Sequence, residues 1–174
     1  MRGLTLLEVL ISIGILSFVI LGVFSVLSVG GANYSTNFAS LGLQQQARQG
    51  MSWLVREVRQ AKWNSVNPLG PDENGNSSIT FDMLNAATGT GVHYFVTKTV
   101  ASGRELWQLQ RTDNAHPAAQ TKANDIRVLT ISKNDAKHII NIGMQASKTI
   151  RSFGKDQTLT FSLNEQIRVR NYNL

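Results

Sequence analysis

The chain has 174 residues and no cysteine, so disulfide bonds, thiol catalysis and zinc sites built on cysteine are excluded. This length is enough for one modest domain beyond a membrane segment. The 17 Lys and Arg residues outnumber the 11 Asp and Glu residues, which gives a net charge of +6. Because the basic residues are scattered and form no run, this charge favours an ordinary solvated surface over a nucleic-acid-binding patch.

A predominantly apolar stretch occupies residues 4–29, and Glu8 is the only charged residue between Arg2 and Arg48. As a helix rising ~1.5 Å per residue, the stretch would extend roughly 39 Å. That length exceeds the ~30 Å hydrocarbon core of a bilayer, so the stretch can span a membrane. A carboxylate inside such a helix costs roughly 2.5–3.5 kcal/mol on insertion scales, so Glu8 requires a partner or a function.

A small residue, Gly3, immediately precedes this stretch, whereas a secretory signal places its cleavage site after the apolar region. The six residues from Gly3 to Glu8, GLTLLE, resemble the processing motif of type IV prepilins and type II secretion pseudopilins. The resemblance implies that a prepilin peptidase cuts between Gly3 and Leu4, that Leu4 is N-methylated, and that Glu8 is the assembly residue. An ordinary signal-anchor with Glu8 near the membrane interface is the alternative.

The resemblance also supplies a partner for Glu8. Helices packed side by side in a filament could offer its carboxylate the free amine of a neighbouring Leu4, and this pair would fix the axial register of each subunit. Two features depart from the commonest pattern in the family. The leader, residues 1–3, is shorter than most, which leaves an upstream start open, and Leu4 stands where Phe is commoner.

A helical period returns after the membrane segment, and an amphipathic helix is expected over residues 31–63. Gly30 and Gly31 form the expected soft point where the helix leaves the bilayer, since glycine costs about 1 kcal/mol against Ala in a helix. One face carries an apolar stripe that is expected to pack on a sheet, formed by Ala47, Met51, Leu54, Val58 and Ala61. The charged residues of this helix are assigned to other faces: Arg48, Arg56, Glu57 and Arg59.

The remaining residues, 64–174, read as a β-rich head. Residues 64–78 and 113–125 are expected to be irregular because they are polar or contain proline and glycine. Hairpins are expected around the turns at 101–104 and 133–136. Five strands are expected before the last segment, at 79–83, 92–100, 105–111, 126–132 and 139–144.

The last segment alternates most clearly, with one apolar parity that only Glu165 interrupts: Leu159, Phe161, Leu163, Ile167 and Val169. Because this run is long for one strand, a bend or bulge is expected near Asn164. The complete prediction is an α+β fold: a long N-terminal helix with a membrane-spanning first half, and an antiparallel sheet of five or six strands packed on its second half. The expected segments are a leader at 1–3, a membrane and filament-core helix at 4–30, an extracytoplasmic helix at 31–63 and a head at 64–174.

No catalytic or cofactor site is expected. The three histidines, His93, His116 and His138, have no metal-ligand spacing, and no nucleotide-binding or nucleophile-elbow motif occurs. The segment that begins at Asp72 superficially suggests a calcium loop. It has Ser77 where that loop needs Gly and Met83 where it needs Glu, so an ordinary turn is favoured. The sequence therefore predicts neither an enzyme nor a metal protein.

The favoured function is that of a structural subunit, a minor pilin or pseudopilin with its N terminus cytoplasmic and its head outside the inner membrane. Residues 53–61, the hairpin strand that ends at Thr112 and the C-terminal strand resemble PilW-type minor pilins and J-type pseudopilins. The resemblance implies as partners prepilin peptidase, other pilin or pseudopilin subunits and the inner-membrane assembly platform. It leaves open whether the filament is a pilus or a secretion pseudopilus.

Two other classes remain as alternatives. A pilin head that captures DNA would need aromatic stacking beside phosphate contacts, and the candidate residues are Trp107, Tyr172, Arg111, Arg168 and Arg170. A simple signal-anchored extracytoplasmic protein would need only the apolar helix. A membrane-anchored enzyme has no support in the sequence.

Overall fold

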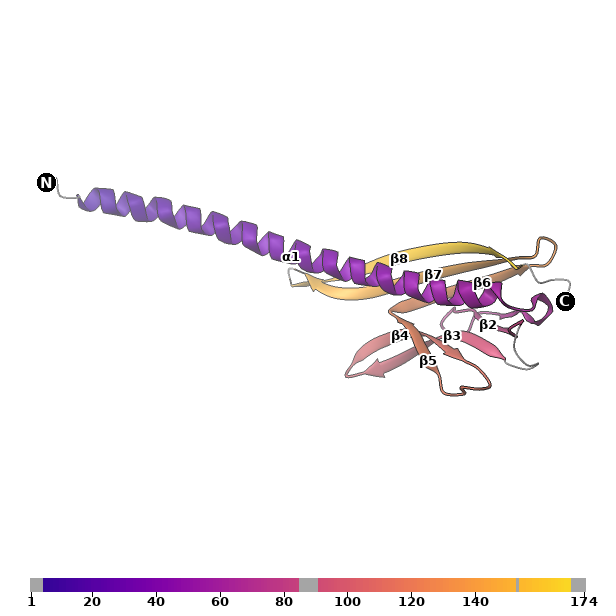
Figure 1. The fold of residues 1–174 in the computed structure, drawn as a ribbon. Helices are drawn as coiled ribbons and strands as arrows, with labels where there is room; N and C mark the ends of the chain where they lie inside the picture. Colours follow the sequence, from indigo (N-terminus) through magenta and orange to yellow (C-terminus); the bar gives the residue numbers. More distant parts are fainter. Residues whose placement is uncertain (1–4, 85–90, 153, 170–174) are drawn as a thin grey trace.

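The computed structural model describes residues 5–84, 91–152 and 154–169. One long helix, α1 (Leu6–Arg59), extends from a β-rich head, and a short 3-10 helix, η1 (Trp63–Ser65), follows it (Figure 1). The strands, in chain order, are β1 (Asn67–Leu69), β2 (Ser78–Phe81), β3 (Val92–Ala101), β4 (Arg104–Thr112), β5 (Gln120–Asn124), β6 (Ile126–Asn134), β7 (Ile139–Ser152) and β8 (Lys155–Arg168).

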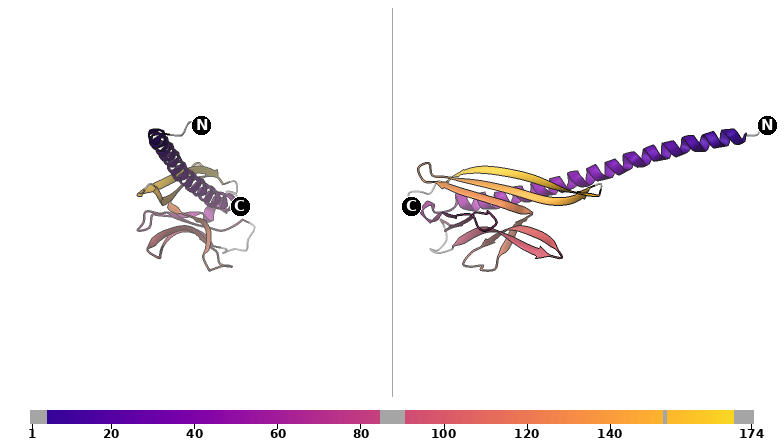
Figure 2. Two further views of the ribbon diagram at one scale, coloured as in Figure 1. Left: turned by 90° about the vertical axis from the view of Figure 1, so that its left-hand side faces the viewer. Right: turned by 180° about the vertical axis from the view of Figure 1, so that it is seen from behind.

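The expected α+β arrangement of one long helix and an antiparallel head is confirmed, but the expectation of a single sheet is wrong. One sheet has the order β1-β2-β3-β4-β5 and the other has the order β6-β7-β8, and all paired strands are antiparallel. The second half of α1 lies along β7 and β8, and β6 contacts strands of the larger sheet. Figure 2 shows the helix and the two sheets from two further sides.

The predicted apolar stripe of α1 forms part of the core. Ala47, Leu54, Val58 and Ala61 are fully buried, and Met51 is nearly so. Complete burial of a side chain such as Leu54 contributes about 1.5–3 kcal/mol, so this face accounts for a large part of the attachment of helix to head. The stripe and the inward-facing positions of β2, β3, β6, β7 and β8 belong to one continuous hydrophobic cluster.

The helix ends earlier than expected. It stops at Arg59, where the Gln60 amide donates to the carbonyls of Glu57 and Val58, and Ala61 already forms a β-bridge with Met83. Ala61 is buried as predicted, but in extended backbone. At the other boundary, α1 is continuous through Gly30, so the expected soft point is not a break in the helix.

Two short strands were missed in the segments expected to be irregular. β1 contains Pro68, which lacks an amide donor, and β1 lies at an edge of its sheet, where proline is tolerated. β5 is mostly polar, and only Ala123 is buried. In both strands the backbone hydrogen bonds to the neighbouring strand outweigh the low strand propensity of the residues.

The last strand follows the predicted alternation but contains no bulge. β8 pairs with β7 along its full length without a register shift, so the expected irregularity near Asn164 is wrong. Ile167 is buried and Leu163 is half-buried, whereas Glu165, on the same parity, is exposed. The two predicted hairpins are present as β3–β4 and β6–β7.

Candidate membrane and assembly segment

The first half of α1 presents an apolar surface to its surroundings. Leu6 is 82% exposed and Phe18 is 79% exposed, and other large apolar side chains as far as Leu41 are similarly uncovered. Exposed apolar patches beyond a few hundred Å² mark contacts with lipid or with other proteins. This helix is long and apolar enough to cross a membrane.

Glu8 lies in the first turn of α1, where its carboxylate closes a capping box with Thr5. The Thr5 amide donates to Glu8 Oε2 over 2.9 Å, and the Glu8 amide donates to Thr5 Oγ1 over 3.3 Å. The Thr5 hydroxyl also donates to Glu8 Oε2 over 3.1 Å. A negative charge at this end of a helix is stabilised by the helix dipole. Glu8 is therefore oriented toward the N-terminal end by bonds within its own chain.

Thr5 is a site residue that the sequence analysis did not single out. The signal for it was present, because Thr5 and Glu8 fit the S/T-x-x-E pattern that precedes an apolar helical run. Two serines in the apolar half also bond to their own helix. Ser12 donates to the Glu8 carbonyl over 2.7 Å, and Ser17 donates to the Ile13 carbonyl over 2.8 Å. These hydroxyls can therefore enter lipid without an unsatisfied donor.

Gly3 and Leu4, the predicted cleavage and methylation residues, lie outside the described residues. Of the three predicted processing and assembly residues, only Glu8 lies within the described part of the chain. Its proposed bond to the amine of a neighbouring subunit remains a prediction.

A buried ion-pair cluster joins the end of α1 to the larger sheet. Arg111 on β4 donates from Nε to Glu57 Oε2 over 2.9 Å and from Nη1 to Asp113. The side chains of Arg111 and Glu57 are only 13% and 11% exposed. Glu57 lies off the apolar stripe as expected, yet it is mostly buried because its carboxylate bonds to Arg111 on β4.

The protonation of this cluster follows from its contacts. Burial opposes the charged form of Asp113, but hydrogen bonds from Arg111 and from the His116 amide lower the pKa of Asp113 to about 2. Burial likewise opposes charge on Arg111, yet its bonds to Glu57 and Asp113 raise its pKa above the usual value. Burial beside Glu57 raises the pKa of Tyr94, which remains a neutral phenol.

Two of the residues that a DNA-capturing head would use already contact other side chains of the head. Arg111, a candidate phosphate contact, is instead held in the ion-pair cluster. Trp107, a candidate stacking residue, has Lys98 and Arg127 near its ring at 5.3 and 5.7 Å from the centroid. Arg168 is exposed, whereas Arg170 and Tyr172 lie outside the described residues. Arg111 is therefore engaged within the head, and the DNA-capturing alternative stays a prediction.

The described residues contain no group of three His, Cys, Asp or Glu side chains that could hold a metal ion. Asp72 Oδ1 accepts from the amides of Asn74 and Asn76, so its carboxylate closes a turn within this segment. Burial lowers the pKa of His93 on β3, so its ring remains neutral, and it stacks on Phe95 at 4.7 Å between centroids. His93 thus has structural surroundings.

A shallow cavity of ≈ 420 Å³ lies over the β6–β8 sheet. Uncharged polar side chains from all three strands line much of it, including Thr130, Asn141 and Asn164, together with Glu165. The lining residues do not include a nucleophile paired with a histidine base. The geometry therefore gives no indication of a reaction at this place.

No protein-family model, curated protein or solved structure matches the chain. The functional assignment consequently rests on the apolar half of α1 and on the position of Glu8 within it.

Proposed function

We propose that the chain is a structural subunit of a type IV pilus or type II secretion filament, cut after Gly3 and assembled through its N-terminal helix. The observation that carries the proposal is the exposed apolar half of α1, and Glu8 is the only Asp, Glu, Lys or Arg of α1 before Arg48. Such a surface is stable in lipid or against other apolar helices. A subunit that is stored in the membrane and then transferred to a filament needs one surface that suits both environments.

The place of Glu8 supports this proposal. A carboxylate in the first helical turn lies close to the chain end that cleavage after Gly3 would create. In a bundle of parallel helices it could meet the methylated amine of a neighbouring Leu4, and each charge would remove the cost of burying the other. The expected partners are prepilin peptidase, other pilin or pseudopilin subunits and the inner-membrane assembly platform. A PilW-type or J-type role within a tip or initiation complex is the finer form of the proposal.

Mass spectrometry of the N terminus tests the proposal directly. The full chain is expressed in matched strains with and without prepilin peptidase. A start at N-methylated Leu4 that depends on the peptidase is the expected result. An intact N terminus in both strains would contradict the proposal and favour a simple signal-anchored extracytoplasmic protein, which uses the same apolar helix without processing.

A DNA-binding head gains no support from the described contacts, because Arg111 is already paired.

A further inference from the structure

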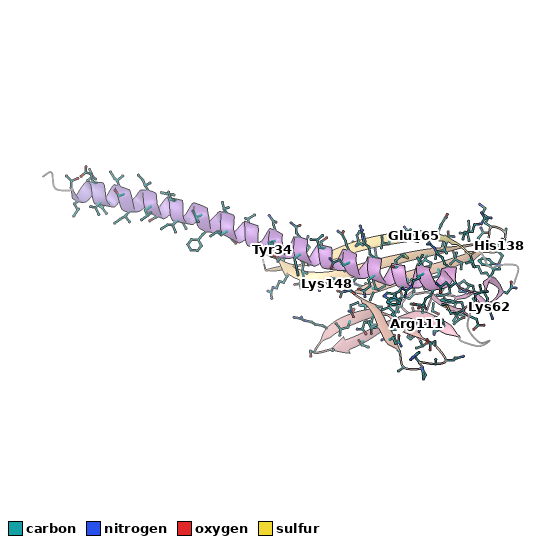
Figure 3. All side chains as sticks on the ribbon, in the orientation of Figure 1. Tyr34, Lys62, Arg111, His138, Lys148 and Glu165 are labelled. Atoms are coloured by element: carbon teal, nitrogen blue, oxygen red, sulfur yellow. The ribbon has the colours of Figure 1, made fainter. Side chains whose placement is uncertain are left out.

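The β7–β8 hairpin extends beside α1 toward the apolar half of that helix. Figures 1 and 2 show the end of β7 and the start of β8 at the side of the head that lies nearest the N-terminal half of α1. In Figure 3, Lys148 on β7 lies at the same end of the head as Tyr34 on α1. β7 and β8 both contact α1. The hairpin end, defined here as residues 148–152 and 155–158, is thus the part of the head closest to the membrane segment.

The burial pattern of α1 shows how far along this helix the contact with the β7–β8 hairpin extends. Ala32, Thr36 and Ala39 are half-buried in a stretch that is otherwise mostly exposed, and they continue the buried stripe of Leu43 and Ala47 at helical spacing. Ala32 lies three residues beyond Val29, where the apolar run ends, which is a rise of roughly 5 Å along the helix. The headgroup layer on each side of a bilayer is also roughly 5–8 Å thick. If the apolar run fills the hydrocarbon core, the hairpin end lies at the level of the lipid headgroups.

The hairpin end is basic. It carries Lys148, Arg151 and Lys155 against one acid, Asp156, a net charge of 3 − 1 = +2. Arg151 and Lys155 are exposed and form no ion pair with another described residue. Lys148 is 49% exposed at its side chain and has Asp125 at 3.7 Å.

We propose that the hairpin end binds anionic phospholipid headgroups on the outer face of the membrane. This inference rests on the proposed insertion of α1. Each Lys or Arg brought to an anionic membrane surface strengthens binding about fivefold. Because α1 tethers the head to the bilayer, the effective concentration of headgroups is high and a few cations suffice. The contact holds the head against the membrane on the hairpin side of α1 before the subunit enters a filament.

The absence of cysteine allows a direct test on the full chain. A single Ser152→Cys substitution carries a fluorophore, and the protein is reconstituted in phosphatidylcholine vesicles with and without phosphatidylglycerol. A quencher attached to the headgroups reports contact. We expect quenching in the anionic vesicles that weakens as salt is added, because salt screens the headgroup charge.

Two matched double variants locate the effect. Arg151→Gln with Lys155→Gln removes two positive charges from the hairpin end, and is expected to weaken the phosphatidylglycerol-dependent contact about tenfold or more. Lys133→Gln with Lys137→Gln removes the same charge near the β6–β7 turn, at the other end of β7. This second variant is expected to leave the contact unchanged. Equal effects of the two variants would show that total charge, not the hairpin end, drives the contact, and would overturn the proposal.

A label at Ser17→Cys separates failure of this inference from failure of the proposed function. Quenching of that label by an acyl-chain quencher reports insertion of α1. If Ser17→Cys is quenched but Ser152→Cys is not, α1 enters the bilayer and lipid binding by the hairpin is wrong; an acidic partner protein then becomes the candidate for this surface. If neither label is quenched, the insertion on which both proposals rest is wrong. Quenching of Ser152→Cys that is equal in neutral and anionic vesicles would refute recognition of anionic lipid.

Discussion

Arg111 on β4 bonds Glu57 near the end of α1 through a 2.9 Å contact between Nε and Oε2, and this pair spans 54 positions of sequence. Both side chains are mostly buried, and Arg111 also bonds Asp113. Removing one member of a buried pair leaves its partner charged and unsatisfied, which costs far more than the pair itself contributes. The ion-pair cluster therefore fixes how α1 sits on the larger sheet.

Replacing Arg111 by Met should destabilise the head by about 3–5 kcal/mol, because Glu57 and Asp113 lose the cation between them. Urea unfolding of the full chain in detergent, followed by tryptophan fluorescence, measures the loss. The double variant Glu57→Met with Arg111→Met is the control, since it removes the buried carboxylate as well. It should lose less stability than the sum of the two single variants; a purely additive result would contradict the coupling.

The sequence predicted the parts of the fold that depend on periodicity. The spacing of Met51, Leu54 and Val58 identifies a helix face, and the alternation from Leu159 to Val169 identifies a sheet face, because each period is set by local backbone geometry. Which strands pair is a different matter. A buried face can pack against any other apolar face, so the division into two sheets could not be read from the pattern.

The ion-pair cluster was missed for a related reason. Glu57 and Arg111 carry charges that local sequence assigns to solvent, and only the tertiary contact of α1 with β4 removes them from water. The capping box at Thr5 and Glu8 is different, because both partners lie in one helical turn and their spacing predicts the bond. Local motifs were thus accessible from the sequence, whereas long-range polar contacts were not.

Acidic pH should weaken the ion-pair cluster that joins the end of β4 to α1. The pKa of Asp113 in the folded protein is lowered to about 2, whereas an unfolded Asp has a pKa of ~3.9. The ionised carboxylate therefore stabilises the fold fully above the unfolded value, and this contribution is lost as the pH falls from about 4 toward 2. Unfolding curves measured across this range should show less pH dependence for Asp113→Asn than for the unaltered chain. The control Asp156→Asn, at an exposed position without a described ion pair, should retain the full dependence.

Gly50 should be intolerant of a side chain. A Cβ there would lie 3.0 Å from Ala123 Cβ and 3.1 Å from Leu109 Cδ2, so α1 could not approach β4 and β5 as closely. We expect Gly50→Val to lose about 1–3 kcal/mol through overpacking. Gly42, on the same helix, has no atom within 4 Å of the equivalent position. The same substitution there should change the free energy of unfolding by less than about 0.5 kcal/mol, because only helix propensity changes. Equal losses at both positions would show that close packing at Gly50 is not the cause.

Glu8→Ala should preserve membrane insertion and impair incorporation into filaments, because the apolar helix remains while the assembly charge is lost.

Two further variants separate the charge of Glu8 from its capping role. Thr5→Ala removes the hydroxyl that caps the helix, at a cost of about 0.5–2 kcal/mol, but keeps the carboxylate. Glu8→Gln keeps an acceptor for the Thr5 amide but removes the charge. If the carboxylate pairs with a neighbouring amine, Glu8→Gln should block incorporation as Glu8→Ala does, and Thr5→Ala should be nearly normal. Membrane flotation and the amount of subunit in sheared filaments provide the two measurements. A normal filament yield with Glu8→Gln, or an equal defect with Thr5→Ala, would assign Glu8 to helix capping alone.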